Sequence, residues 1–142
     1  MSPQTTNQLA KWGFLPLRCA VAVVFLMHGG QKVLYFGVSG VADMLTKLGF
    51  PLAAFFAVLL MTIEVAGGLA ILFGFLTRAA GLILAVEMAI AIYVARLGGG
   101  FFTPYGFEFE MTLMGACLTF AAVGAGGVSI DAALRARRGP TT

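Results

Sequence analysis

Six side chains that can carry charge or form hydrogen bonds interrupt segments of the chain that are otherwise apolar. The stretch FLMHGGQKVLYFG (residues 25–37) holds a histidine, a glutamine and a lysine, and three glutamates occur within or at the start of later apolar segments. An ionisable group at the centre of a membrane helix costs about 2.5–3.5 kcal/mol, so such a residue requires a partner or a function. The candidate site residues are His28, Gln31, Lys32, Glu64, Glu87 and Glu108.

These residue types suit proton exchange beside a polar ligand. Imidazole and carboxyl groups in a low-dielectric site can accept and release protons, which assigns the catalytic role to His28, Glu64 and Glu87. An amide, an ammonium and a carboxylate can hold a polar ligand by hydrogen bonds, which assigns ligand binding to Gln31, Lys32 and Glu108. The alternative interpretation is structural, because paired buried ions can also fix the register of two helices.

The composition indicates an integral membrane protein. Of the 142 residues, 60% are hydrophobic and 11% are charged, against about 25% charged residues in an ordinary soluble domain. The mean hydropathy is +0.97, which predicts a single domain (residues 1–142) in the inner (plasma) membrane, surrounded by lipid. The basic residues are scattered, which excludes a nucleic-acid-binding face. Cys19 and Cys117 form no CxxC motif, and no other spacing predicts a metal site.

The hydrophobic segments predict an all-α fold with four transmembrane helices packed as a bundle. A spanning helix needs about 20 mainly apolar residues, and the segments that approach this length are about 12–35, 51–76, 79–97 and 108–123. Small residues every fourth position, as at Gly81, Ala85 and Ala89, favour close helix packing. A short amphipathic tail, residues 128–138, follows the fourth helix.

The distribution of lysine and arginine predicts the orientation, because cytoplasmic loops carry an excess of these residues. Six basic residues fall on the side of the two termini and three on the other side, which places both termini in the cytoplasm. The six are Lys11, Arg18, Arg78, Arg135, Arg137 and Arg138. The segment 36–50 is then an outward-facing loop. Arg18, near the inner end of the first helix, is expected to extend its guanidinium to the membrane interface.

Three motifs in this order resemble the DoxX family of small membrane proteins. Arg18 followed by HGGQK (28–32) resembles the family's first-helix signature. EVAGGLAILFGFLTR (64–78) resembles its second-helix pattern of a glutamate, glycines and a closing basic residue. GAGGVSID (124–131) resembles its GPG…SLD ending, with alanine and valine as departures.

The resemblance implies a four-helix membrane bundle and the role of an oxidoreductase subunit linked to quinone or to thiol and sulfur chemistry. A quinone or a sulfur compound would then bind near the polar residues, and the electron carrier would be a quinone, a partner subunit or a haem. Two alternatives remain open. The chain could be a membrane scaffold or assembly factor without catalysis, or a small solute transporter that works as a homo-oligomer.

Overall fold

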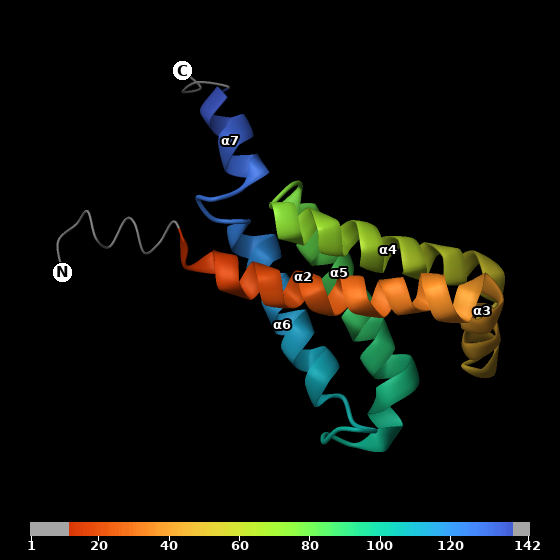
Figure 1. The fold of residues 1–142 in the computed structure, drawn as a ribbon. Helices are drawn as coiled ribbons and strands as arrows, with labels where there is room; N and C mark the ends of the chain where they lie inside the picture. The colour runs from red at the N-terminus through yellow and green to blue at the C-terminus, as the bar shows by residue number, and fades with distance from the viewer. Residues whose placement is uncertain (1–11, 138–142) are drawn as a thin grey trace.

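The computed structural model describes residues 12–137, which form helices and turns with no strand among them. Figure 1 shows the six α-helices: α2 (Phe14–Gln31), α3 (Gly37–Lys47), α4 (Ala53–Phe73), α5 (Thr77–Ala91), α6 (Glu108–Val123) and α7 (Ile130–Arg137). Two π-helical segments, η1 (Lys32–Phe36) and η2 (Ile92–Arg96), extend α2 and α5, and a 3-10 turn, η3 (Leu97–Gly99), follows η2. Lys11 and Arg138, which contributed to the predicted orientation, lie outside the described residues.

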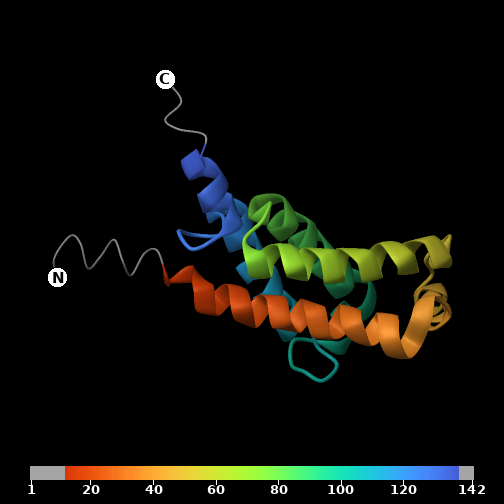
Figure 2. The same ribbon diagram turned by 45° about the horizontal axis from the view of Figure 1, so that its top comes forward.

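The helices pack as two pairs. Helix α2 packs against α4, and α5 packs against α6; Figures 1 and 2 show α2 and α4 side by side, with the second pair crossing them. Glycines permit the close approach within the second pair. A Cβ added to Gly81 would lie 2.7 Å from the carbonyl oxygen of Cys117 and 2.8 Å from the amide nitrogen of Ala121. The small residue predicted to favour packing therefore lies directly against the backbone of α6.

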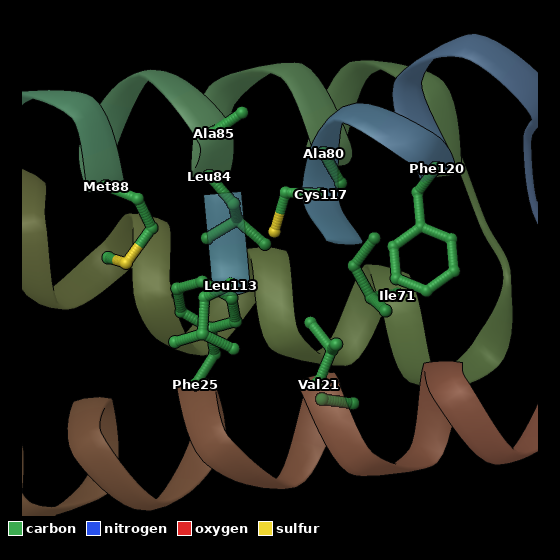
Figure 3. Packing of buried hydrophobic residues seen from close by; sticks show 11 residues of the cluster. Val21, Phe25, Ile71, Ala80, Leu84, Ala85, Met88, Leu113, Cys117 and Phe120 are labelled. Atoms are coloured by element: carbon green, nitrogen blue, oxygen red, sulfur yellow. The ribbon is translucent and has the colours of Figure 1, made fainter. Parts of the chain in front are cut away.

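One buried core joins both pairs. Figure 3 shows Val21 and Phe25 of α2 facing Ile71 of α4, Leu84 of α5 and Phe120 of α6. All five side chains are less than 5% exposed. Because lipid is as apolar as these side chains, the core contributes mainly through close packing between the helices. A second, smaller cluster, made by Val41, Leu45, Ala57 and Met61, packs α3 against α4.

Residues 36–50, predicted as a loop, are mostly helical, so the loop prediction was wrong, while the outward-facing position of this segment stays a prediction. Helix α3 occupies residues 37–47 and follows η1 after a break at Gly37, whose φ of +62° suits a residue without a Cβ. Figures 1 and 2 show α3 turned away from the axis of α2. The loop was predicted because the segment contains polar residues such as Asp43 and Lys47. These residues belong to an amphipathic helix that buries Val41 and Leu45 on its other face.

Three helical stretches within residues 12–137 are long and apolar enough to cross a membrane: Phe14–Lys47, Ala53–Phe73 and Thr77–Gly99. The fourth predicted span corresponds to α6, which has 16 residues and therefore a length of about 24 Å, shorter than the roughly 30 Å hydrocarbon core. The all-helical membrane fold is thus confirmed, with three candidate spans. The fourth crossing and the cytoplasmic position of both termini stay predictions.

Arg18 is buried and does not reach toward the membrane interface, so the prediction for this residue was wrong. Its side chain lies at the end of the bundle where α2 begins and α4 ends, and the residue is 2% exposed. The guanidinium donates to the carbonyl oxygens of Ile71 at 3.0 Å and Leu72 at 2.6 Å. It also donates to those of Ala125 at 3.2 Å and Val128 at 2.5 Å. The last carbonyls of a helix have no partner within the helix, and Arg18 supplies one for α4 and for the segment after α6.

Asp131 stabilises the same end of the bundle by binding the start of α5. Its carboxylate accepts hydrogen bonds from the backbone N–H groups of Leu76 at 2.9 Å and Thr77 at 3.0 Å, at the start of α5. Burial opposes the ionisation of Asp131, but these donors and nearby Arg135 outweigh it and hold the pKa of the carboxyl below its ordinary value. We call Arg18, Gly74 and Asp131 the end junction, because Gly74 lies between the two charged residues in the turn from α4 to α5.

Candidate functional site

Lys32 and Glu64 form an ion pair inside the membrane-spanning part of the bundle. The Nζ of Lys32 donates to both carboxylate oxygens of Glu64, at 2.6 and 2.7 Å. The Glu64 side chain is 5% exposed and the Lys32 side chain 17%. Gly29, one turn before Lys32, allows this contact: a Cβ there would lie 3.0 Å from the Cβ of Glu64 and 2.9 Å from a methyl group of Val65. The glycine of the HGGQK motif thus brings α2 close to α4 beside the pair.

Glu87 of α5 is the third member of this cluster. The residue is 9% exposed, and its carboxyl lies within electrostatic range of the carboxyl of Glu64 and the ammonium of Lys32. No described residue donates a hydrogen bond to its buried Oε2 atom. Two carboxyl groups thus face one ammonium. Such a site can hold one additional proton between its carboxyls and release it, so the Lys32–Glu64–Glu87 cluster has the composition of a proton-exchanging site.

His28 and Gln31 lie elsewhere and do not contact the glutamates. Both are exposed on α2, and the His28 ring lies 6.0 Å from the ring of Phe109 on α6. They line a cavity of about 270 Å³ between the end of α2 and α3, together with Lys32, Phe36, Gly40, Val41 and Met44. Lys32 connects this cavity to the cluster, because its side chain lines the cavity while its ammonium binds Glu64.

Glu108 belongs to neither group. Its carboxylate accepts hydrogen bonds from the backbone N–H of Thr103 at 2.9 Å and from the hydroxyl of Thr103 at 2.7 Å. These bonds close the loop that precedes α6. The structure therefore brings together Lys32, Glu64 and Glu87, places His28 and Gln31 beside Lys32, and places Glu108 apart from them, bound to Thr103.

Glu110 is the buried carboxyl of α6 that the sequence interpretation did not select. The residue is 8% exposed, and its Oε1 accepts a hydrogen bond from the Nε of Arg96 at 2.8 Å. Its buried Oε2 receives no hydrogen bond from the described residues. A signal was present in the sequence: Glu110 lies three, seven and ten residues before Leu113, Cys117 and Phe120, the buried face of α6. Glu108 falls off that face.

The two cysteines are not a redox pair. Cys19 is exposed on α2, whereas Cys117 is fully buried in the core, and both are free thiols. No group of three or more potential metal ligands occurs within residues 12–137.

Comparison with known proteins gives consistent matches. The DoxX family model matches residues 13–97, more than half of the chain. The chain is 29% identical to "Putative oxidoreductase CatD" of Bacillus subtilis (strain 168) over 107 residues, 75% of this chain and 77% of CatD. It is 31% identical to "Inner membrane protein YqjF" of Escherichia coli (strain K12) over 127 residues, 88% of this chain and 94% of YqjF.

A third relative is named only as a membrane protein. It is "Uncharacterized membrane protein Rv3486" of Mycobacterium tuberculosis, 37% identical over 95 residues, which cover 64% of this chain and 58% of Rv3486. No solved structure matches the chain closely enough for comparison. Two of these three names give a membrane location, and the third names an activity.

Proposed function

This chain belongs to the DoxX family of inner-membrane proteins, and from that premise we propose that it is the membrane subunit of a redox system. In this proposal the Lys32–Glu64–Glu87 cluster exchanges protons with a quinone ring held in the cavity beside Lys32. The observation that carries it is the cluster itself, in which two buried carboxyls and one ammonium adjoin a cavity in a membrane-spanning helix pair. The name of CatD as an oxidoreductase supports the same class of activity.

The cavity suits a ring with two carbonyl groups. Its volume of about 270 Å³ lies near the lower end of ligand cavities. Lys32, Gln31 and His28 offer hydrogen-bond donors to a carbonyl oxygen, while Phe36, Val41 and Met44 offer apolar contacts to the ring. A quinone is therefore compatible with both parts of the lining.

The proposed reaction balances when two thiols of a partner act as the reductant. The partner's two S–H groups give up two electrons and two protons as the S–S bond forms, and the two quinone oxygens accept both to give the quinol. The reacting thiols are not those of Cys19 and Cys117, because one is exposed and the other is buried in the core. The role of this chain is to bind the ring and to supply or remove protons through Lys32 and the two glutamates.

Bound quinone is the first measurement. The protein is extracted gently from its native membrane, and quinone is quantified by mass spectrometry in the native chain and in the Lys32→Gln and Lys47→Gln variants. We expect stoichiometric quinone in the native protein, at least a tenfold loss in Lys32→Gln, and full retention in Lys47→Gln, whose lysine lies exposed on α3. Equal quinone in all three proteins, or none in the native protein even after incubation with a short-chain quinone, would contradict the proposal.

A scaffold function is the second candidate. It is favoured by the end junction, because Arg18 and Asp131, two residues of the DoxX-like motifs, bind backbone groups of this chain. Under this alternative the Lys32–Glu64 pair only fixes helix packing. Folded Glu64→Gln protein would then lose partner recovery in a native pull-down while quinone content stayed the same.

A further inference from the structure

A second buried carboxyl, Glu110, lies on the same helix pair as Glu87. Both residues are at least nine-tenths buried, and the Oε2 atom of each has no hydrogen-bond donor among the described residues. A buried carboxylate oxygen without a donor is costly. Two of them on facing helices are more readily understood as groups that bind and release protons than as contributions to stability.

The register of α5 and α6 orders these two carboxyls along the bundle. Gly81 packs against Cys117 and Ala121 at one level, and Arg96 binds Glu110 at another. Glu87 lies between Gly81 and Arg96 in sequence, so it lies between these two levels along α5 and η2. Glu110 precedes Cys117 by seven residues, two turns on the same face, so it lies about 10 Å further along the helix.

The far end of this row reaches the surface. The Arg96 side chain is 41% exposed, against 11% for Glu110, and its guanidinium also donates to the carbonyl oxygen of Pro104 at 3.3 Å in the loop before α6. Leu113, which is 8% exposed, belongs to the same buried face of α6, between Glu110 and Cys117. The row therefore runs from Glu87, past an apolar side chain, to Glu110 and then to an exposed guanidinium.

We propose that Glu110 and Arg96 form the proton exit of the Lys32–Glu64–Glu87 cluster, on the side of the loop before α6. A proton leaves the Glu87 carboxyl, passes Leu113 on a transiently entering water, and protonates Glu110; from there it passes to solvent beside Arg96. Each transfer restores a carboxylate on the donor and adds no other reactant. This inference rests on the proposed proton exchange at the cluster and gives it a route and a direction.

The charged groups around Glu110 differ from those around Glu108. Glu110 faces Arg96 from the segment after α5 and has Glu87 inward on the same helix pair, whereas Glu108 is bound to Thr103 within its own loop. Glu108→Gln is therefore a matched control for Glu110→Gln, because the chemical change is the same and the two sites are two residues apart on one helix.

The test is hydrogen exchange at the Glu87 carboxyl, which needs neither quinone nor a partner. Infrared difference spectroscopy in reconstituted membranes detects the C=O band of a protonated carboxyl and its shift after transfer to heavy water, and Glu87→Gln identifies the band. We expect Glu110→Gln to slow this exchange at least tenfold and Glu108→Gln to leave it unchanged. Native exchange rates in Glu110→Gln, or the lack of a Glu87 band in the native protein at every pH between 4 and about 9, overturn the inference.

A second pair of variants covers the case in which Glu110→Gln does not fold. Leu113→Ala shortens the apolar side chain that lies on α6 between Glu110 and Cys117. Val21→Ala removes buried atoms from the same core, but on α2 and toward the end junction. We expect faster exchange in Leu113→Ala only; equal rates in these two variants overturn the route. Quinone content reports separately on the proposed function, since it depends on Lys32 and the cavity and not on Glu110.

Discussion

Arg18 is expected to be the side chain whose loss most weakens the end of the bundle. Arg18→Met keeps much of the apolar stem but removes the guanidinium that donates to four backbone carbonyls, those of Ile71, Leu72, Ala125 and Val128. The carbonyl of Ile71 still accepts from the backbone N–H of Gly74 at 3.2 Å, so three of the four lose their donor. An unsatisfied buried polar group costs about 1–3 kcal/mol, and the low end applies because a carbonyl oxygen can use its second lone pair. The gross loss is therefore about 3 kcal/mol.

Part of this loss is offset, because the variant no longer buries a charge. The cost of burying an ion is several kcal/mol before its hydrogen bonds are counted, so we expect a net destabilisation of about 1–3 kcal/mol. For a chain of this length, that corresponds to a fall in Tm of about 3–9 °C. Arg18→Lys should fall between the native protein and Arg18→Met, because an ammonium has three donors but lacks the planar fork of a guanidinium.

Thermal unfolding in detergent, followed by circular dichroism, measures these differences. Arg78→Gln is the control, since Arg78 is exposed and forms no hydrogen bond or ion pair among the described residues; it should stay within about 0.5 kcal/mol of the native protein. If Arg18→Met were as stable as Arg78→Gln, the four hydrogen bonds would contribute nothing, and the interfacial position predicted from the sequence would be the better account of Arg18.

Three further predictions concern other residues of the bundle. Gly74→Ala should unfold at least 5 °C lower by the same assay, because a Cβ there would lie 2.7 Å from the Arg18 guanidinium at a φ of +66°, while Gly115→Ala, with open space around it, should match the native protein. Asp131 has a pKa lowered from 3.8 in the folded chain, so its stabilising effect is complete above that value and is lost as the pH falls through the folded pKa. Asp131→Asn should therefore be less stable at pH 7, with a difference that shrinks in unfolding experiments below about pH 3.8. Lys32→Met should destabilise by about 3–5 kcal/mol by stranding Glu64, and adding Glu64→Leu should recover most of it; a double variant no better than the single one argues against a direct pair.

The membrane class and the helical fold were predictable from composition. A chain with few charges and long apolar segments partitions into lipid, where helices satisfy the backbone hydrogen bonds of each segment internally. The proximity of Lys32 and Glu64 could be predicted in part, because Glu64 lies at the centre of the predicted span 51–76 and Lys32 lies in the outer half of the predicted span 12–35. The position of His28 could not be predicted. The sequence places it four residues before Lys32, but only the contact of Gly29 with α4 determines that Lys32 faces inward while His28 faces the cavity and Phe109.

Arg18 was predictable in principle. Val21, Ala22, Phe25 and Gly29 follow it at the spacing of one helix face, and all are buried. A basic residue on that face points into the bundle and not to the interface. The prediction failed because it weighed the cost of a buried charge alone, without the unsatisfied carbonyls at helix ends that a guanidinium can bind.

The end junction also has a consequence for how the protein is made. Arg18 and Val128 are joined by a hydrogen bond across 110 residues of sequence, and the start of α5 is completed by Asp131, 54 residues after Thr77. During synthesis, the first helices enter the membrane before either partner has left the ribosome. The guanidinium of Arg18 and the turn before α5 therefore lack these partners until residues 128–131, which are translated after the apolar segments of α2 to α6, complete the fold. A chain cut before residue 128 would carry every apolar segment and still lack both partners.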